Sequence, residues 1–141
     1  MYCITHFIAG AIVGAATPGP AGAAVAGLVT HAVLDRVPHS DYSRAAQGVL
    51  DVAVTGLFAF CILMAGADVR AIAGGLGGAL PDLEVAAAFL FPKAYGPHGP
   101  LRLLFPSHNG LVRHGRLAFP WGAFTQILAI AGLAVLFLWV L

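Results

Sequence analysis

The sequence predicts an all-α protein of the membrane, a polytopic helical bundle of about five helices that forms one integral membrane domain over residues 1–141. Hydrophobic residues make up 60% of the chain and charged residues only 9%, whereas soluble domains are about 45–50% apolar. The mean hydropathy is +0.89. A soluble domain of this length has too little interior to bury so much apolar surface, so we expect the lipid bilayer to surround it.

The first apolar stretch runs from Ile4 to Leu34 and is divided by Pro18-Gly19-Pro20. Two prolines around a glycine do not continue a helix. We therefore expect a short N-terminal helical hairpin, with arms at about residues 4–17 and 21–36. Gly10 and Gly14 form a G-x-x-x-G pattern, which favours close packing between membrane helices.

Three further helical segments follow. Residues 48–67 are a candidate membrane span, interrupted only by Asp51. Residues 69–80 are rich in glycine and predict a thin helix, which we expect Pro81 to kink or end before a short helix at residues 85–91. Pro120 to Leu141 carries no charge and reaches about 33 Å as a helix, enough to span a hydrocarbon core of about 30 Å. The long polar connection, residues 92–118, is typical of functional loops.

The basic residues predict an orientation. If each segment crosses the bilayer, one side receives six of the seven basic residues, and only Arg70 lies opposite; the six are Arg36, Arg44, Lys93, Arg102, Arg113 and Arg116. The excess of positive charge predicts that this side is cytoplasmic. The N-terminus would then be cytoplasmic, and the C-terminus would lie on the other side.

The same side receives nearly all the residues that bind metals. His31 and Asp35 are four residues apart and share one helix face, so both can reach one ion. Imidazole and carboxylate together suit zinc, and iron or manganese would also fit. We predict one to three ions, with ligands drawn from His6, His31, Asp35, His39, Asp82, His108 and His114. Asp41, Asp51 and Asp82 are the candidate catalytic acids.

Several of these residues also have ordinary interpretations. Asp51 can cap a helix or pair with its dipole, Asp82 can be the N-cap of a helix at residues 83–91, and His6 can face lipid headgroups. The candidates outnumber the ligands of one tetrahedral ion. Either some of them orient the true ligands, or a carboxylate bridges two ions as in two-metal sites.

The motifs resemble those of a family of small bacterial inner-membrane proteins described as metal-dependent hydrolases. The matching pieces are Thr5-His6, Gly27 to Asp35 with Pro38 to Asp41, Gly77 to Asp82, and the pair His108 and His114. The resemblance implies a multi-pass protein of the bacterial inner membrane with hydrolytic activity. The mixed set of histidine and aspartate is also similar in kind to the multi-zinc sites of phospholipase C and P1-type nucleases.

The hypothesis is a zinc-dependent hydrolase at the cytoplasmic interface, acting on a phosphoester or lipid-like substrate. A bound zinc ion lowers the pKa of its water to about 7, so no separate strong base is needed. The alternative is a non-enzymatic accessory subunit of a larger membrane complex, since glycine and alanine surfaces suit packing against a partner. The net charge of +1 gives no electrostatic case for nucleic acid.

Overall fold

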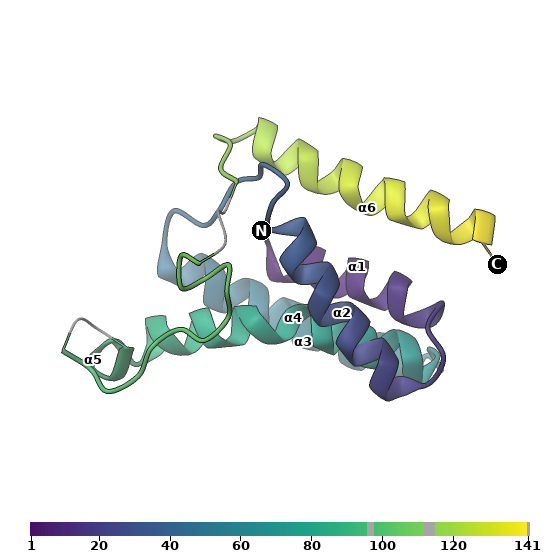
Figure 1. The fold of residues 1–141 in the computed structure, drawn as a ribbon, viewed down its shortest axis with the longest axis horizontal. Helices are drawn as coiled ribbons and strands as arrows, with labels where there is room; N and C mark the ends of the chain where they lie inside the picture. The colour runs from purple at the N-terminus through teal and green to yellow at the C-terminus, as the bar shows by residue number, and fades with distance from the viewer. Residues whose placement is uncertain (96–97, 112–114, 141) are drawn as a thin grey trace.

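A computed structural model describes residues 1–95, 98–111 and 115–140, and these residues form six helices and no strand (Figure 1). The helices are α1 (Cys3–Ala15), α2 (Pro20–Leu34), α3 (Ala45–Met64), α4 (Val69–Leu90), α5 (Pro92–Tyr95) and α6 (Trp121–Val140). The prediction of an all-helical chain is confirmed. The sixth helix is α5, a single turn within the connection that we expected to be irregular.

The N-terminal hairpin is present as α1 and α2. Gly19 joins them with a φ of 75°, a left-handed conformation that glycine adopts without steric cost. Pro20 then occupies the first position of α2, where its fixed φ suits a helix and its missing N–H is not needed. The proline-glycine-proline break therefore ends one helix and starts the next.

Pro81 does not end a helix, so the expectation of a separate short helix after it was wrong. α4 continues through Pro81 to Leu90, so Asp82 lies inside a long helix and is not the N-cap of a short one. Proline removes one hydrogen bond of the helix, but membrane helices tolerate this when neighbouring helices support the backbone. Here α1 and α2 both pack against the glycine-rich part of α4 just before Pro81.

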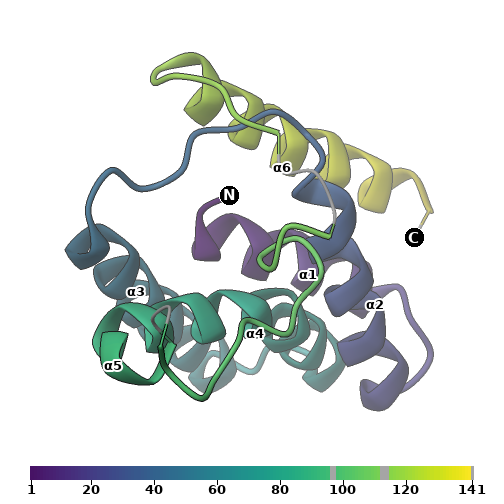
Figure 2. The same cartoon turned by 60° about the vertical axis from the view of Figure 1, so that its left-hand side comes forward.

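Glycines bring these three helices into backbone contact. A Cβ atom on Gly74 would lie 2.3 Å from the carbonyl oxygen of Gly10, and one on Gly77 would lie 2.1 Å from that of Ala24. Any larger residue would push the helices apart, so the predicted close packing through small residues is present. Figure 2 shows α1 between α6 on one side and α3 and α4 on the other.

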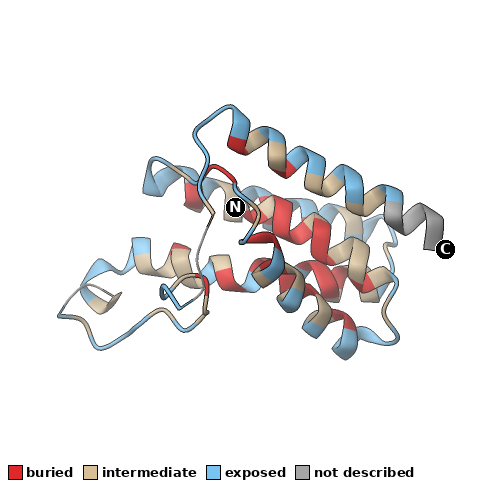
Figure 3. Cartoon of the chain, turned by 45° about the horizontal axis from the view of Figure 1, so that its top comes forward, coloured by how far each residue is buried: buried red, intermediate tan, exposed pale blue. Residues whose placement is uncertain are grey.

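Two of the described helices, α3 and α4, are long and apolar enough to cross a membrane. α1, α2 and residues 121–135 of α6 are apolar but shorter. Buried residues are concentrated along α1, while the outer faces of the surrounding helices are exposed (Figure 3). Those outer faces carry large apolar side chains that are more than half exposed, among them Leu57, Phe60, Leu76 and Ile127.

Candidate metal centre

Asp35 lies at the centre of a buried polar cluster. It follows the last residue of α2, and its side chain is fully buried. Its Oδ2 atom lies 3.1 Å from Nε2 of His31 and accepts a hydrogen bond of 2.5 Å from the hydroxyl of Ser107. Its Oδ1 atom lies 3.1 Å from Nε2 of His6. One carboxylate thus contacts residues from α1, α2 and the connection before α6.

Separate parts of the chain supply the histidines around Asp35. His31 is one turn earlier on α2, on the face predicted from the spacing of four residues. The ring of His6, from α1, stacks on that of His31 with centroids 3.7 Å apart. His108 comes from the connection after α5, and its Nε2 atom lies 3.4 Å from Nε2 of His31.

Three atoms of this cluster have the spacing of metal ligands. Nε2 of His31, Nε2 of His108 and Oδ2 of Asp35 are separated by 3.1, 3.4 and 3.6 Å. Ligands bound to zinc at about 2.0–2.1 Å in a tetrahedron lie about 3.3–3.4 Å from one another. The three atoms therefore form one face of such a tetrahedron without any rearrangement.

The tautomer of His31 supports the same conclusion. Its Nδ1 atom donates a hydrogen bond of 2.7 Å to the carbonyl oxygen of Gly78, so a neutral ring carries no proton on Nε2. That Nε2 atom nevertheless faces a carboxylate oxygen of Asp35 and a ring nitrogen of His108. These three atoms lie close enough together to hold a cation between them. A backbone carbonyl that orients the ring is a common support for a histidine ligand.

The charge state of Asp35 follows from its neighbours. Burial raises the pKa of a carboxyl group, but the close contacts of its oxygens with His108, His31 and His6 outweigh burial and hold the pKa of Asp35 well below its usual range. Asp35 is therefore ionised in the folded protein, as a metal ligand must be.

Asp82 and His6 extend the cluster on the other side. Oδ1 of Asp82 lies 3.8 Å from Nε2 of His108. The ligand atoms of His6, His31 and Asp82 all lie within 4.8 Å of one another, as do those of His31, Asp35 and His108. The structure thus brings together five of the predicted site residues, namely His6, His31, Asp35, Asp82 and His108.

His39 and Asp41 lie beside this centre. Nδ1 of His39 donates a hydrogen bond of 2.6 Å to the carbonyl of Val37, and its Nε2 lies 3.2 Å from Oδ1 of Asp41 and 2.6 Å from the amino group of Met1. The same amino group lies 3.5 Å from Oδ1 of Asp35. Met1 therefore separates the pair from the centre that we predicted it to join.

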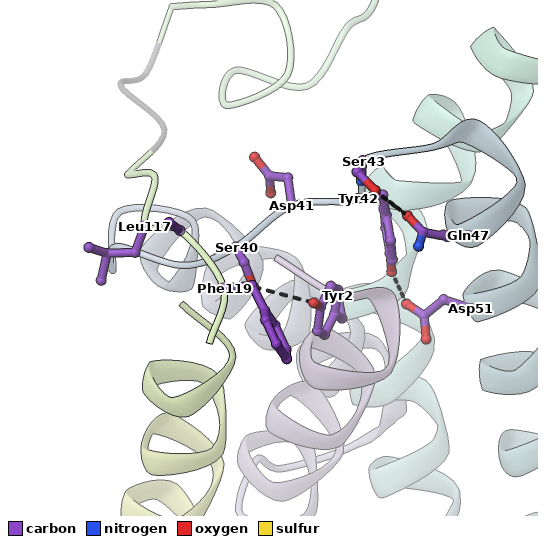
Figure 4. A pocket seen from close by; sticks show the side chains of 10 residues that line it. Tyr2, Ser40, Asp41, Tyr42, Ser43, Gln47, Asp51, Leu117 and Phe119 are labelled. Carbon is purple, nitrogen blue, oxygen red and sulfur yellow. Dashed lines mark hydrogen bonds between the residues drawn. The ribbon is translucent and has the colours of Figure 1, made fainter. Parts of the chain in front are cut away.

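Asp51 has a different position from the other candidates. Its Oδ2 atom accepts hydrogen bonds from the hydroxyl of Tyr42 and, over 3.3 Å, from the backbone N–H of Ile4 (Figure 4). It therefore caps the start of α1, a role that differs from both sequence interpretations, a cap at the start of its own helix and a catalytic acid. His114, the last predicted ligand, lies outside the described residues.

A cavity of about 290 Å³ opens beside the cluster. Its polar wall includes Asp82, Ser107 and His108, and Arg116 and Asp41 lie at the same cavity. Its apolar wall consists of Val85 and Phe89 from α4, with Leu103 from the connection. A second cavity of about 600 Å³ adjoins it at Asp41 and Tyr42; its wall combines polar side chains such as Ser40 and Gln47 with Leu117 and Phe119 (Figure 4).

Two polar residues near the centre were missed in the sequence. Ser107 contacts Asp35 directly. Its position next to the predicted ligand His108 could have indicated that it belongs to the site. Gln126 is buried, and its side chain accepts hydrogen bonds from Tyr2 N–H and the Thr5 hydroxyl. A single amide inside the apolar stretch that begins at Pro120 was a comparable signal.

No family model, curated protein or solved structure matches this chain.

Proposed function

We propose that this chain is a membrane-embedded, metal-dependent hydrolase that binds zinc and acts at the cytoplasmic face of a bacterial inner membrane. The substrate is a phosphoester or a similar bond in a lipid-like molecule. One observation carries the proposal, namely the triangle of ligand atoms from His31, Asp35 and His108 with its sides of 3.1, 3.4 and 3.6 Å. The triangle lies next to a cavity that has both a polar and an apolar wall.

The lengths of the helices support a position just inside the membrane surface. α1 has 13 residues and α2 has 15, about 20 and 23 Å, so neither crosses a core of about 30 Å. α1 begins beside Asp51, in the second turn of α3. The centre therefore lies near the N-terminal end of α3. The exposed apolar faces of α3 and α4 suit contact with lipid.

The residues of the cavity suit an amphiphilic substrate. A zinc ion held by the triangle supplies a Lewis acid and a water of lowered pKa. Val85, Phe89 and Leu103 provide the apolar contact that small-molecule sites use for most of their ligand surface. Arg116 can pair with a phosphate group. Its side chain is 81% exposed, and its contact with Asp41 is a long one, with Nε 3.4 Å from the carboxylate. Asp82 lies in the polar wall, 3.8 Å from Nε2 of His108.

Elemental analysis of the detergent-purified protein tests the metal centre. We expect zinc, iron or manganese in the unmodified protein and loss of the metal in both H31A and H108A, because the two residues come from distant parts of the chain. H98A is the matched control, since His98 is exposed and belongs to neither ligand group. H98A should keep its metal.

The absence of metal after zinc is resupplied would contradict the proposal and favour the accessory-subunit alternative, for which co-purifying partners would be examined next. Activity needs a second test, in which the metal-loaded protein is assayed with nitrophenyl phosphate esters and with short-chain phospholipids in mixed micelles. Hydrolysis that continues undiminished after chelation would exclude the metal from the reaction.

A further inference from the structure

The triangle of His31, Asp35 and His108 uses only one oxygen of Asp35. Its other oxygen, Oδ1, lies 3.1 Å from Nε2 of His6, on a different helix from His31, and 3.5 Å from the amino group of Met1. The two oxygens of this carboxylate therefore face two different sets of nitrogen atoms.

His6 is fully buried; its Nε2 atom faces Oδ1 of Asp35, and its Nδ1 atom has no hydrogen-bond partner among the described residues. The same is true of the buried Oδ2 atom of Asp82. Buried polar atoms are almost always hydrogen-bonded. An imidazole and a carboxylate that each keep one buried atom without a partner, and whose ligand atoms lie within 4.8 Å of each other, are well placed to share a cation.

His31 cannot serve both sets. Its Nδ1 atom is occupied by the carbonyl of Gly78, so only Nε2 is available, and that atom belongs to the triangle. A tetrahedral catalytic zinc takes three protein ligands and leaves one position open. Five side chains therefore exceed the needs of one ion. Because His31 belongs to the triangle, Oδ1 of Asp35, which lies 3.1 Å from His6, takes its place beside His6 and Asp82.

We propose that the centre holds two metal ions bridged by the carboxylate of Asp35. One ion binds His31, His108 and Oδ2 of Asp35, and the other binds His6, Asp82 and Oδ1 of Asp35. This inference rests on the proposed metal centre and goes beyond it in the number of ions and in the roles of His6 and Asp82. Paired ions bridged in this way clamp the attacking and leaving oxygens of a displacement at phosphorus.

Metal stoichiometry tests the pair of ions. The protein is saturated with zinc, dialysed against metal-free buffer and analysed for zinc per chain. We expect two ions in the unmodified protein, one in H6Q and D82N, and two in the matched controls H98A and D68N. Asp68 is an exposed acid paired with Arg70. D35N should lose both ions. Circular dichroism and gel filtration of each variant check that it is folded.

The outcomes separate the two proposals. No zinc in the unmodified protein would contradict both. If the unmodified protein holds one zinc and H6Q and D82N keep it, only the second site is overturned. If the unmodified protein holds one zinc and H6Q loses it, a single ion includes His6, which also overturns the second site.

Electron paramagnetic resonance of the manganese(II)-loaded protein needs no variant. A spin-coupled pair is expected, and the spectrum of isolated ions at full occupancy would contradict the bridge.

Discussion

The Nδ1 atom of His31 is hydrogen-bonded to the carbonyl oxygen of Gly78 over 2.7 Å. This contact joins a ligand on α2 to the backbone of α4, and it leaves Nε2 facing the centre. The backbone of α4 around Gly78 therefore orients a side chain that lies 47 positions earlier in the sequence.

Substitution of Gly78 should disturb both packing and metal binding. A Cβ atom there would lie 2.4 Å from the carbonyl oxygen of His6, so G78A must displace α1. We expect the free energy of unfolding to fall by about 1–3 kcal/mol, the usual cost of overpacking, and zinc affinity to fall with it. Denaturant unfolding in detergent and zinc competition measure the two effects.

G56A is the control for that experiment. Gly56 lies in α3 with no atom within 4 Å of its added Cβ. Alanine should be tolerated there or should stabilise the helix by about 0.5–1 kcal/mol. Equal destabilisation by both substitutions would contradict the argument from close packing.

Ser107 should act on metal affinity through Asp35. Its hydroxyl donates a hydrogen bond of 2.5 Å to Oδ2 of Asp35, and loss of such a supporting bond lowers metal affinity about 10–100-fold. We expect this loss in S107A and its recovery in S107T, which keeps the hydroxyl. Competition with a fluorescent zinc chelator measures the affinity, and an S107A protein that binds zinc normally would contradict the role.

The sequence was sufficient to predict an all-helical chain and the N-terminal hairpin, because composition and the proline-glycine-proline break act locally. It also placed His31 and Asp35 on one helix face from their spacing. Pro81 misled the prediction, since its effect depends on the helices that pack around it. A proline that would end an isolated helix is accommodated in α4 where α1 and α2 support the backbone.

The distribution of candidates around the centre depends on contacts between distant segments. Nothing local in the sequence indicates that Asp51 caps α1 through the N–H of Ile4, because the two residues lie on different helices. His39 and Asp41 lie in the connection between α2 and α3, and no spacing rule determines where such a connection directs its side chains. His6 and His108 could be identified only as ligand types, and their contacts with Asp35 required the fold.

Gln126 should be important for the attachment of α6. Its amide donates a hydrogen bond of 3.1 Å to the carbonyl of Ser40 and accepts one of 2.9 Å from the N–H of Tyr2. Q126L would leave these buried groups without partners, at about 1–3 kcal/mol each. We expect a lower free energy of unfolding and faster proteolysis before α6.

L128A is the matched control on the same helix. Leu128 is 54% exposed, so its truncation should change the stability in detergent far less than Q126L does. A larger effect of L128A would indicate that the outer face of α6, and not Gln126, holds the helix in place.

Tyr42 should resist ionisation. Burial, together with the hydrogen bond to Asp51, raises the pKa of Tyr42 far above its usual value of about 10. Its neutral form is favoured in the folded state, so the stability it contributes is present below about pH 10 and is lost as the pH rises above it. Ultraviolet absorbance should show Tyr42 ionising only on unfolding, and Y42F should remove that step. An unchanged titration in Y42F would contradict the assignment.

The glycine contacts between α1, α2 and α4 have a consequence for how the proposed ions would enter. Because main chains touch directly at Gly10, Gly74 and Gly77, the separation of the three helices does not depend on side-chain packing or on the ions themselves. The apo protein should already have its liganding atoms in place. Calorimetry should then record ion uptake with a small change in heat capacity, unlike the large change that accompanies coupled folding and binding.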